Sequence, residues 1–234
     1  KEQIKIPPFY PMLGPHGRVD AGETYGGCHT FYRDALFSTL MELKPVVCLE
    51  IGTNIGHTAR VFQRYFEYLN IKDALLITAD VKIYSAQMAE LDLSIKHPST
   101  EQVQVYPHVN NIKDHHIIED ADLIEGEVEP TGSVERNIAA IKEVMTRRGV
   151  LEFDFAFIDG DHQRESMLKD IEIAEALIKD PGYILLDDIQ DYQHESAKTF
   201  HEEVKPQYNH YVFKEWDNLV TEKSTAGVAL IWQR

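Results

Sequence analysis

The sequence is poor in cysteine and lacks a long apolar run. Two of its 234 residues are cysteine, Cys28 and Cys48, and neither belongs to a Cys-x-x-Cys pair. The sequence therefore indicates neither a disulfide framework nor a cysteine-based zinc site, and this cysteine usage favours a reducing, cytoplasmic location. No stretch approaches the roughly 18 consecutive apolar residues of a membrane helix, and no signal peptide is visible. We therefore expect no membrane association.

Positive charge is also scarce. The chain has 23 Lys and Arg residues against 39 Asp and Glu residues, which gives a formal net charge of -16 at pH 7. An acidic surface repels phosphate backbones, so nucleic acids and anionic membranes are disfavoured as partners. The hydrophobic content of 43% is ample for a folded core, and the length suits one α/β domain.

Apolar runs of strand length alternate with segments of helical periodicity. Strands are expected at 46–51, 75–79, 103–106, 153–158, 183–186, 210–214 and 227–232, and helices at 29–43, 58–69, 85–93, 137–147, 163–178 and 196–204. This alternation predicts an α/β fold with a doubly wound, mostly parallel, seven-stranded sheet. The short connection between the last two strands allows a terminal antiparallel hairpin.

The N-terminal residues differ in composition from the rest of the chain. Residues 1–28 are rich in Pro and Gly, which predicts an irregular arm or lid. A single domain over residues 29–234 is expected to follow it. Such an arm could reach a neighbouring subunit, which would suit a homodimer.

Acidic residues stand at the ends of four predicted strands, at Glu50, Asp80, Asp159 and the pair Asp187 and Asp188. Ligands of doubly wound sheets bind at the carboxyl ends of the strands, so we expect these side chains to meet in one crevice. The last three would repel one another unless a cation or shared protons relieve them. Oxygen ligands suit Mg²⁺. Alternatively, one aspartate caps a helix and another is solvated.

A glycine turn follows the first predicted strand. Gly52 allows the backbone to turn sharply and approach a ligand, and the next helix begins with free N–H groups. The dinucleotide pattern GxGxxG fails because Asn54 and His57 occupy its second and third glycine places, which argues against a nicotinamide or flavin enzyme. Asp80 could accept hydrogen bonds from both hydroxyls of a ribose, or it could cap the next helix.

Two candidate bases lie just beyond the acidic cluster. Either Asp161 or His162 could take a proton from a substrate hydroxyl, and histidine titrates near neutral pH. The segment 107–133 contains an acidic run and three further histidines, His108, His115 and His116. We interpret this segment as a solvated loop near the substrate rather than as a metal site.

These residues resemble the class I S-adenosylmethionine (SAM)-dependent methyltransferases. The stretch Glu50–Gly56 resembles the first motif of that class. The run FAFIDGDH at 155–162, followed by a helix and then PGYILLDDI at 181–189, is similar to the small-molecule O-methyltransferase branch, which includes macrocin-type sugar O-methyltransferases. The resemblance covers about residues 45–232 and does not extend to the segment 107–133, where the family usually binds the adenine. It implies a Rossmann-like fold and methyl transfer from SAM to a hydroxyl of a small molecule.

The resemblance also implies roles for individual residues. The residues that would bind SAM are Glu50, Gly52, Thr53, Asn54, Gly56, Asp80 and Asp159. The residues that would bind Mg²⁺ are Asp159, Asp187 and Asp188. Asp161 matches the suspected base of the sugar enzymes, with His162 as the other candidate.

Three other functions stay open at this point. Cephalosporin-hydroxylase-like relatives share the DGDH…LDD pattern, so the scaffold does not fix the reaction. A non-catalytic SAM-binding subunit is a second alternative. A metal-dependent hydrolase that uses the carboxylates without SAM is a third.

Overall fold

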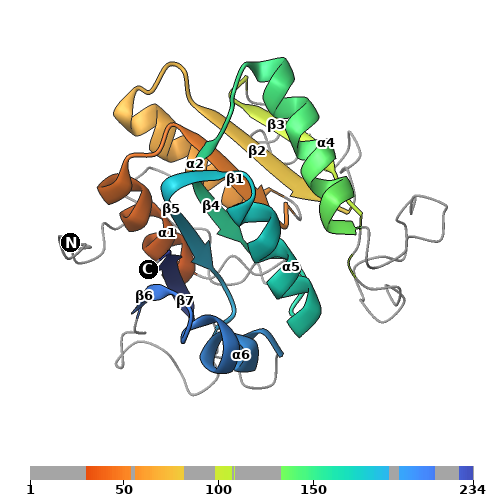
Figure 1. Ribbon diagram of the computed structural model, residues 1–234. Coiled ribbons are helices and arrows are strands. Elements are labelled where there is room, and N and C mark those ends of the chain that lie inside the picture. Colours follow the sequence, from red (N-terminus) through yellow and green to blue (C-terminus); the bar gives the residue numbers. More distant parts are fainter. Residues whose placement is uncertain are drawn as a thin grey trace.

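The computed structural model describes residues 30–53, 56–81, 98–106, 108, 133–189, 195–213 and 227–233. In this part of the chain a seven-stranded sheet lies between two layers of helices (Figure 1). The helices found here are all too short or too polar to cross a membrane. The predicted arm at 1–28, the predicted helix at 85–93 and most of the segment 107–133 lie outside the described residues.

The sheet is parallel except for one strand. Its order is β3 (Thr100–Gln104), β2 (Leu75–Asp80), β1 (Val47–Ile51), β4 (Phe153–Ile158), β5 (Ile178–Leu186), β7 (Val228–Trp232) and β6 (Asn209–Phe213). Strand β7 runs antiparallel to both β5 and β6, while the pairs from β3 to β5 are parallel. The predicted mostly parallel sheet with a terminal antiparallel hairpin is therefore confirmed.

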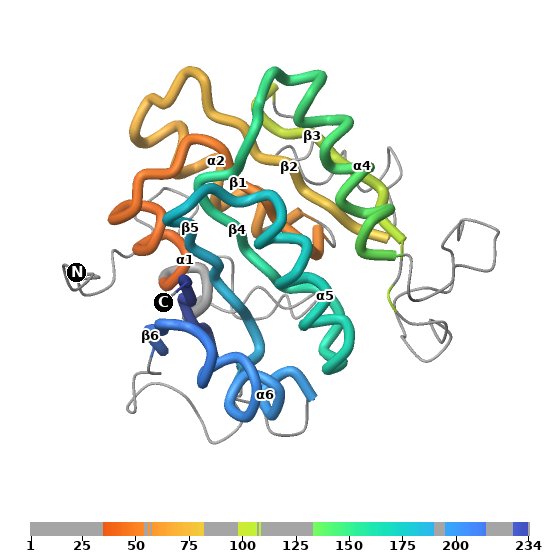
Figure 2. Tube along the Cα trace, in the orientation of Figure 1, coloured from red at the N-terminus to blue at the C-terminus, as the bar shows by residue number. Residues whose placement is uncertain are grey.

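Helices cover both faces of the sheet, and the path of the chain through them can be followed in Figure 2. One face packs against α1 (Thr30–Leu43) and α2 (His57–Leu69). The other packs against α4 (Ser133–Arg148), α5 (Arg164–Glu175) and the short α6 (Glu195–Thr199), which continues as the π-helical turn η4 (Phe200–Val204). Alternate strand residues face opposite cores: Cys48 and Leu76 face α1 and α2, whereas Leu49 and Ile77 face α4 and α5.

Several predicted element boundaries were wrong. The helix predicted to end at Ile178 ends at Glu175, because Ile178 pairs with Phe153 and begins β5. Strand β5 therefore begins five residues earlier than the predicted position 183. Strand β3 begins three residues earlier than predicted and α4 four residues earlier. In each case long-range packing outweighs local periodicity.

Candidate active site

The end of β1 lies against the end of β4 at a single glycine. Gly52 has a φ of +100°, and its amide donates to the carbonyl oxygen of Ala79 on β2 at 2.8 Å. A Cβ atom at Gly52 would lie 1.9 Å from the carbonyl oxygen of Asp159. Both the conformation and this close approach require glycine. The contact places the predicted SAM-binding turn directly beside the first residue after β4.

A chain of buried hydroxyl groups supports this turn from within the sheet. The hydroxyl of Thr53 lies 2.6 Å from that of Thr78, and Thr78 donates to the carboxylate of Glu50. Glu50 is fully buried, so we expect it to order the turn. Gly56 has a φ of +85° just before α2, and its amide donates to the carbonyl oxygen of Thr53. Asn54 lies outside the described residues.

Asp80 ends β2, the strand next to the glycine turn. Its backbone carbonyl accepts a hydrogen bond from Val105, which extends the pairing of β2 with β3. The residue is partly exposed. Asp80 at the end of β2 and Gly52 just after β1 therefore lie at the same edge of the sheet, the edge at which doubly wound folds bind their ligands.

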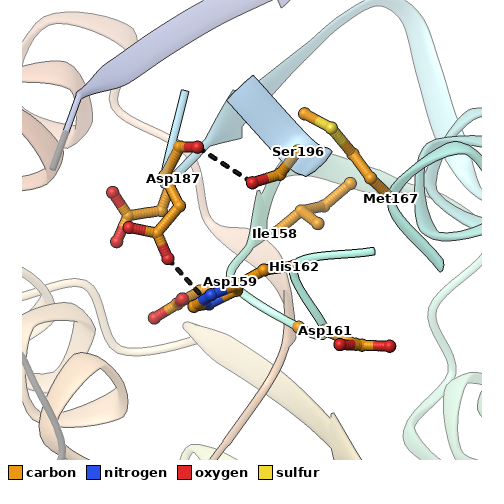
Figure 3. Close-up of a pocket in the computed structure, with 9 residues that line it drawn as sticks. Ile158, Asp159, Asp161, His162, Met167, Asp187 and Ser196 are labelled. Atoms are coloured by element: carbon orange, nitrogen blue, oxygen red, sulfur yellow. Dashed lines mark hydrogen bonds and ion pairs between the residues drawn. The ribbon is translucent and has the colours of Figure 1, made fainter. Parts of the chain in front are cut away.

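Three aspartates gather at the ends of β4 and β5 (Figure 3). The amide of Asp159 donates to the last residue of β1 at 2.8 Å, and the amide of Asp187 donates to the last residue of β4 at 3.0 Å. The strand pairing thus continues past the strand ends and brings Asp159, Asp187 and Asp188 to one small cavity. His162 lines the same cavity, and one ligand atom from each of Asp159, His162 and Asp188 lies within 4.8 Å of the others.

His162 and Asp188 form an ion pair in this cavity, with 2.7 Å between Nε2 and Oδ2. The hydrogen bond to Asp188 and the neighbouring carboxylates raise the pKa of His162. Asp188 has a left-handed backbone with a φ of +53°, which aspartate tolerates better than most residues. Ser196 of α6 holds both partners, because its hydroxyl donates to the carbonyl oxygen of Asp188 and its amide to that of His162, each at 3.0 Å.

Asp187 is the most deeply buried acid of the cluster, with 8% of its surface exposed. Its Oδ1 has no hydrogen-bond partner among the described residues. Burial, together with the charges of Asp159 and Asp188, raises the pKa of Asp187 well above its usual range. A buried carboxylate is stable only where a proton or a cation compensates its charge. Either a proton on Asp187 or a divalent cation in the cavity would compensate this charge.

Asp161 lines the same cavity but does not belong to the group of possible ligands formed by Asp159, His162 and Asp188. Its Oδ2 accepts a hydrogen bond from the hydroxyl of Ser166 on α5 at 2.9 Å. Of the two predicted bases, the structure thus places His162 among the acidic side chains and holds Asp161 against α5. The proton-accepting role of Asp161 stays a prediction.

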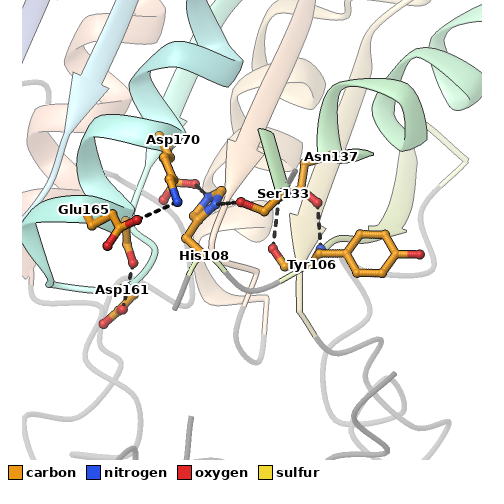
Figure 4. Close-up of polar contacts among 9 residues, drawn as sticks. Tyr106, His108, Ser133, Asn137, Asp161, Glu165 and Asp170 are labelled. Atoms are coloured by element: carbon orange, nitrogen blue, oxygen red, sulfur yellow. Dashed lines mark hydrogen bonds and ion pairs between the residues drawn. The ribbon is translucent and has the colours of Figure 1, made fainter. Parts of the chain in front are cut away.

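His108 belongs to a buried polar network (Figure 4). Its Nδ1 lies 2.9 Å from the hydroxyl of Ser133 and its Nε2 lies 2.8 Å from Oδ1 of Asp170. The prediction of a solvated His108 was wrong, because both ring nitrogens have buried partners. His115 and His116 lie outside the described residues.

Asp170 connects this network to the loop after β4. A Cβ atom at Gly160 would lie 2.7 Å from Oδ2 of Asp170, so α5 packs directly against that loop. Sequence reasoning missed Asp170, although its position contained a signal. It falls on the face of α5 that also buries Met167 and Ala174, and an acid on an apolar face needs a buried partner.

Replacing His108 with alanine should lower the free energy of unfolding by about 3 kcal/mol, because Asp170 would stay buried without its partner. Urea denaturation measures this loss. The control is His210→Ala on β6, where the ring is partly exposed and makes a long 3.4 Å contact with Tyr208; it should cost about 1 kcal/mol or less. Equal losses in the two variants would contradict the importance of the network.

Comparison with known proteins identifies the family. A family model described as a methyltransferase domain matches residues 49–189, from β1 to just beyond Asp188. This is more than half of the chain, and it contains every predicted site residue. Among curated proteins, none matches the sequence.

Solved structures share the fold at low sequence identity. The O-methyltransferase TomG from Streptomyces achromogenes, which is involved in tomaymycin synthesis and was solved with SAM, is 15% identical with a TM-score of 0.55, over 88% of this chain and 81% of that chain. The O-methyltransferase from Bacillus cereus, solved with S-adenosylhomocysteine (SAH), is 14% identical with a TM-score of 0.53, over 86% and 80%. A Klebsiella pneumoniae protein assigned as an O-methyltransferase is 15% identical with a TM-score of 0.56, over 89% and 82%. The chain belongs to the methyltransferase-domain family and has the fold of SAM-dependent O-methyltransferases.

Proposed function

We propose that the protein transfers the methyl group of SAM to a hydroxyl of a small molecule, assisted by a divalent cation at Asp159 and Asp188. The observation that supports this most strongly is the contact between Gly52 and Asp159, where a Cβ would lie 1.9 Å from the carbonyl oxygen. It sets the predicted SAM turn beside the acidic cluster. Methyl transfer needs the reacting atoms held about 3–3.5 Å apart, so the two sites must adjoin.

Individual residues of the chain would have separate roles in this reaction. Gly52 shapes the turn against which SAM would lie, and Asp80 on the next strand would accept the ribose hydroxyls. The carboxylates of Asp159 and Asp188 would hold the cation, and Asp187 lines the same cavity. Oxygen ligands predict Mg²⁺, and such a cation lowers the pKa of an acceptor hydroxyl when it is bound. Asp161, held by Ser166, would accept the proton.

The proposal is tested by following SAH release from SAM with a panel of neutral sugars, catechols and other phenols. The net charge of -16 favours neutral or cationic acceptors over polyanions, because like charges repel. Release of SAH that depends on one acceptor supports the proposal. SAM binding without SAH release from any acceptor would favour a non-catalytic subunit, and the absence of SAM binding would favour a hydrolase.

Asp80→Ala should raise the Kd for SAM by about 10- to 100-fold, because the ribose hydroxyls would lose a charged hydrogen-bond partner. Isothermal titration calorimetry measures the change. Asp73→Ala, an exposed position between α2 and β2, is the matched control and should bind SAM as the unchanged protein does. An unaltered Kd in Asp80→Ala would refute the ribose assignment.

Asp161→Asn should reduce the rate of SAH release by about 100-fold or more, since the amide cannot accept the proton. The Kd for SAM should stay the same, which separates this residue from those that bind the cofactor. Ser166→Ala, which removes the hydrogen bond to Asp161, should lose less. Turnover by Asp161→Asn at the original rate would exclude Asp161 as the base.

A further inference from the structure

His162 changes the chemistry of the acidic cluster. The sequence predicts a set of oxygen ligands alone, but Nε2 of His162 lies 2.7 Å from Oδ2 of Asp188, and a ring nitrogen of His162 belongs to the group of ligand atoms within 4.8 Å of one another. We propose that His162 is a direct ligand of the cation, and that the site prefers a first-row transition metal to Mg²⁺. The inference rests on the proposed function for the presence of a cation, and it goes further by assigning the nitrogen ligand and the class of metal.

The spacing of the three ligand atoms suits a single ion. A divalent transition metal binds nitrogen and oxygen at about 2.0–2.2 Å, so two atoms bound to the same ion lie at most about 4.4 Å apart. The 2.7 Å between Nε2 of His162 and Oδ2 of Asp188 is within this reach. The 4.8 Å limit that contains all three ligand atoms exceeds it by about 0.4 Å. The His162 side chain is 40% exposed and can make such a small adjustment.

The backbone of the cluster is already held in place. Ser196 binds the carbonyl oxygens of both His162 and Asp188, and the amide of Asp159 is bound to the end of β1. Ligands on a fixed backbone lose little conformational freedom when the ion binds.

Asp187 provides an independent indication of a cation. It lines the same cavity, is 8% exposed, and has an Oδ1 with no hydrogen-bond partner in the described part of the chain. A cation bound by His162, Asp159 and Asp188 would lie in the same cavity as this oxygen, whereas the ion pair of His162 with Asp188 alone does not satisfy it.

An imidazole ligand distinguishes among metals. Mg²⁺ prefers oxygen ligands and keeps several waters, whereas imidazole suits transition metals such as Fe²⁺, Ni²⁺ and Zn²⁺, and Mn²⁺ is the weakest binder of the same first-row series. The assignment also separates the two predicted bases. A nitrogen that binds the metal has no lone pair left for the substrate proton, so the ligand assignment would leave Asp161 as the candidate base of the two.

The test is metal binding to the full chain in the absence of SAM, first by calorimetry with Mn²⁺ and with Mg²⁺. Mn²⁺ is the weakest binder of the first-row series, and we expect even this ion to bind at least about tenfold more tightly than Mg²⁺. Pulsed electron paramagnetic resonance of the bound Mn²⁺ should show hyperfine coupling to an imidazole nitrogen. His162→Gln should abolish this coupling and weaken Mn²⁺ binding by about 10- to 100-fold, with little change for Mg²⁺.

His210→Gln on β6 is the matched control and should leave both affinities and the nitrogen coupling intact. The urea midpoint of each variant shows whether it is folded. Nitrogen coupling that persists in His162→Gln, or an unchanged ratio of Mn²⁺ to Mg²⁺ affinity, overturns the ligand assignment. If the unaltered chain binds no Mn²⁺, the site itself is overturned. Calorimetry of SAM with the same sample then shows whether the methyltransferase proposal fails with it.

Discussion

Replacing Gly52 with alanine should abolish SAM binding and lower the free energy of unfolding by about 3 kcal/mol or more. Two costs add. A residue with a Cβ pays about 1–2 kcal/mol for a left-handed backbone, and Gly52 has a φ of +100°. In addition, the new Cβ would lie 1.9 Å from the carbonyl oxygen of Asp159. Because that oxygen belongs to the backbone, the ends of β1 and β4 would have to separate, at a cost of about 1–3 kcal/mol.

Gly149→Ala is the matched control for this prediction. Gly149 also has a positive φ, of +71°, but a Cβ there would meet nothing within 4 Å. It should pay only the backbone cost of about 1–2 kcal/mol and bind SAM normally. Urea denaturation and calorimetry measure the two effects. Equal destabilisation of the two variants would show that the contact with Asp159 is unimportant, and full SAM affinity in Gly52→Ala would refute the role of the turn.

Asp188→Asn should weaken binding of a divalent cation by about 100-fold or more, because a charged ligand is lost. Asparagine tolerates the left-handed backbone at this position, so the fold should be kept. The metal-free protein should be as stable as before or slightly more stable. The loss of the hydrogen bond to His162 is offset by the removal of one charge that acts on the buried Asp187.

Calorimetry with Mn²⁺ and urea denaturation in a chelator test this prediction together. Asp73→Asn, at an exposed position outside the cluster, serves as the control and should change neither quantity. SAM binding should survive in Asp188→Asn and in chelator, because the glycine turn and Asp80 are intact. Cation binding at the original affinity in Asp188→Asn would show that this carboxylate is not a ligand.

The sheet could be predicted because its central strands are buried on both faces and are therefore continuous apolar runs. The predicted bounds of β4 match the structure, from Phe153 to Ile158. The start of β5 could not be predicted in the same way. Ile178 continues the helical periodicity of α5, and only its pairing with Phe153 makes it part of a strand.

The candidate site also has a part that could be predicted from the sequence and a part that could not. Aspartates at the ends of parallel strands must share one edge of the sheet, so the meeting of Asp159 with Asp187 and Asp188 followed from the order of elements. The place of His162 depends on Ser196 of α6, which folds back to bind its carbonyl oxygen, and no local pattern reveals that contact. The partners of His108 are likewise 25 and 62 residues away in sequence.

Calorimetry of SAM and SAH on the purified chain tests the central claim most directly, since every assigned role depends on a cofactor that lies beside Gly52 and Asp80. We predict binding of both, with Kd values on the order of 1 to 100 μM, which Asp80→Ala weakens and a chelator does not. Failure to bind either molecule would contradict the account, and the cluster of Asp159, His162 and Asp188 would then belong to metal-dependent chemistry without SAM.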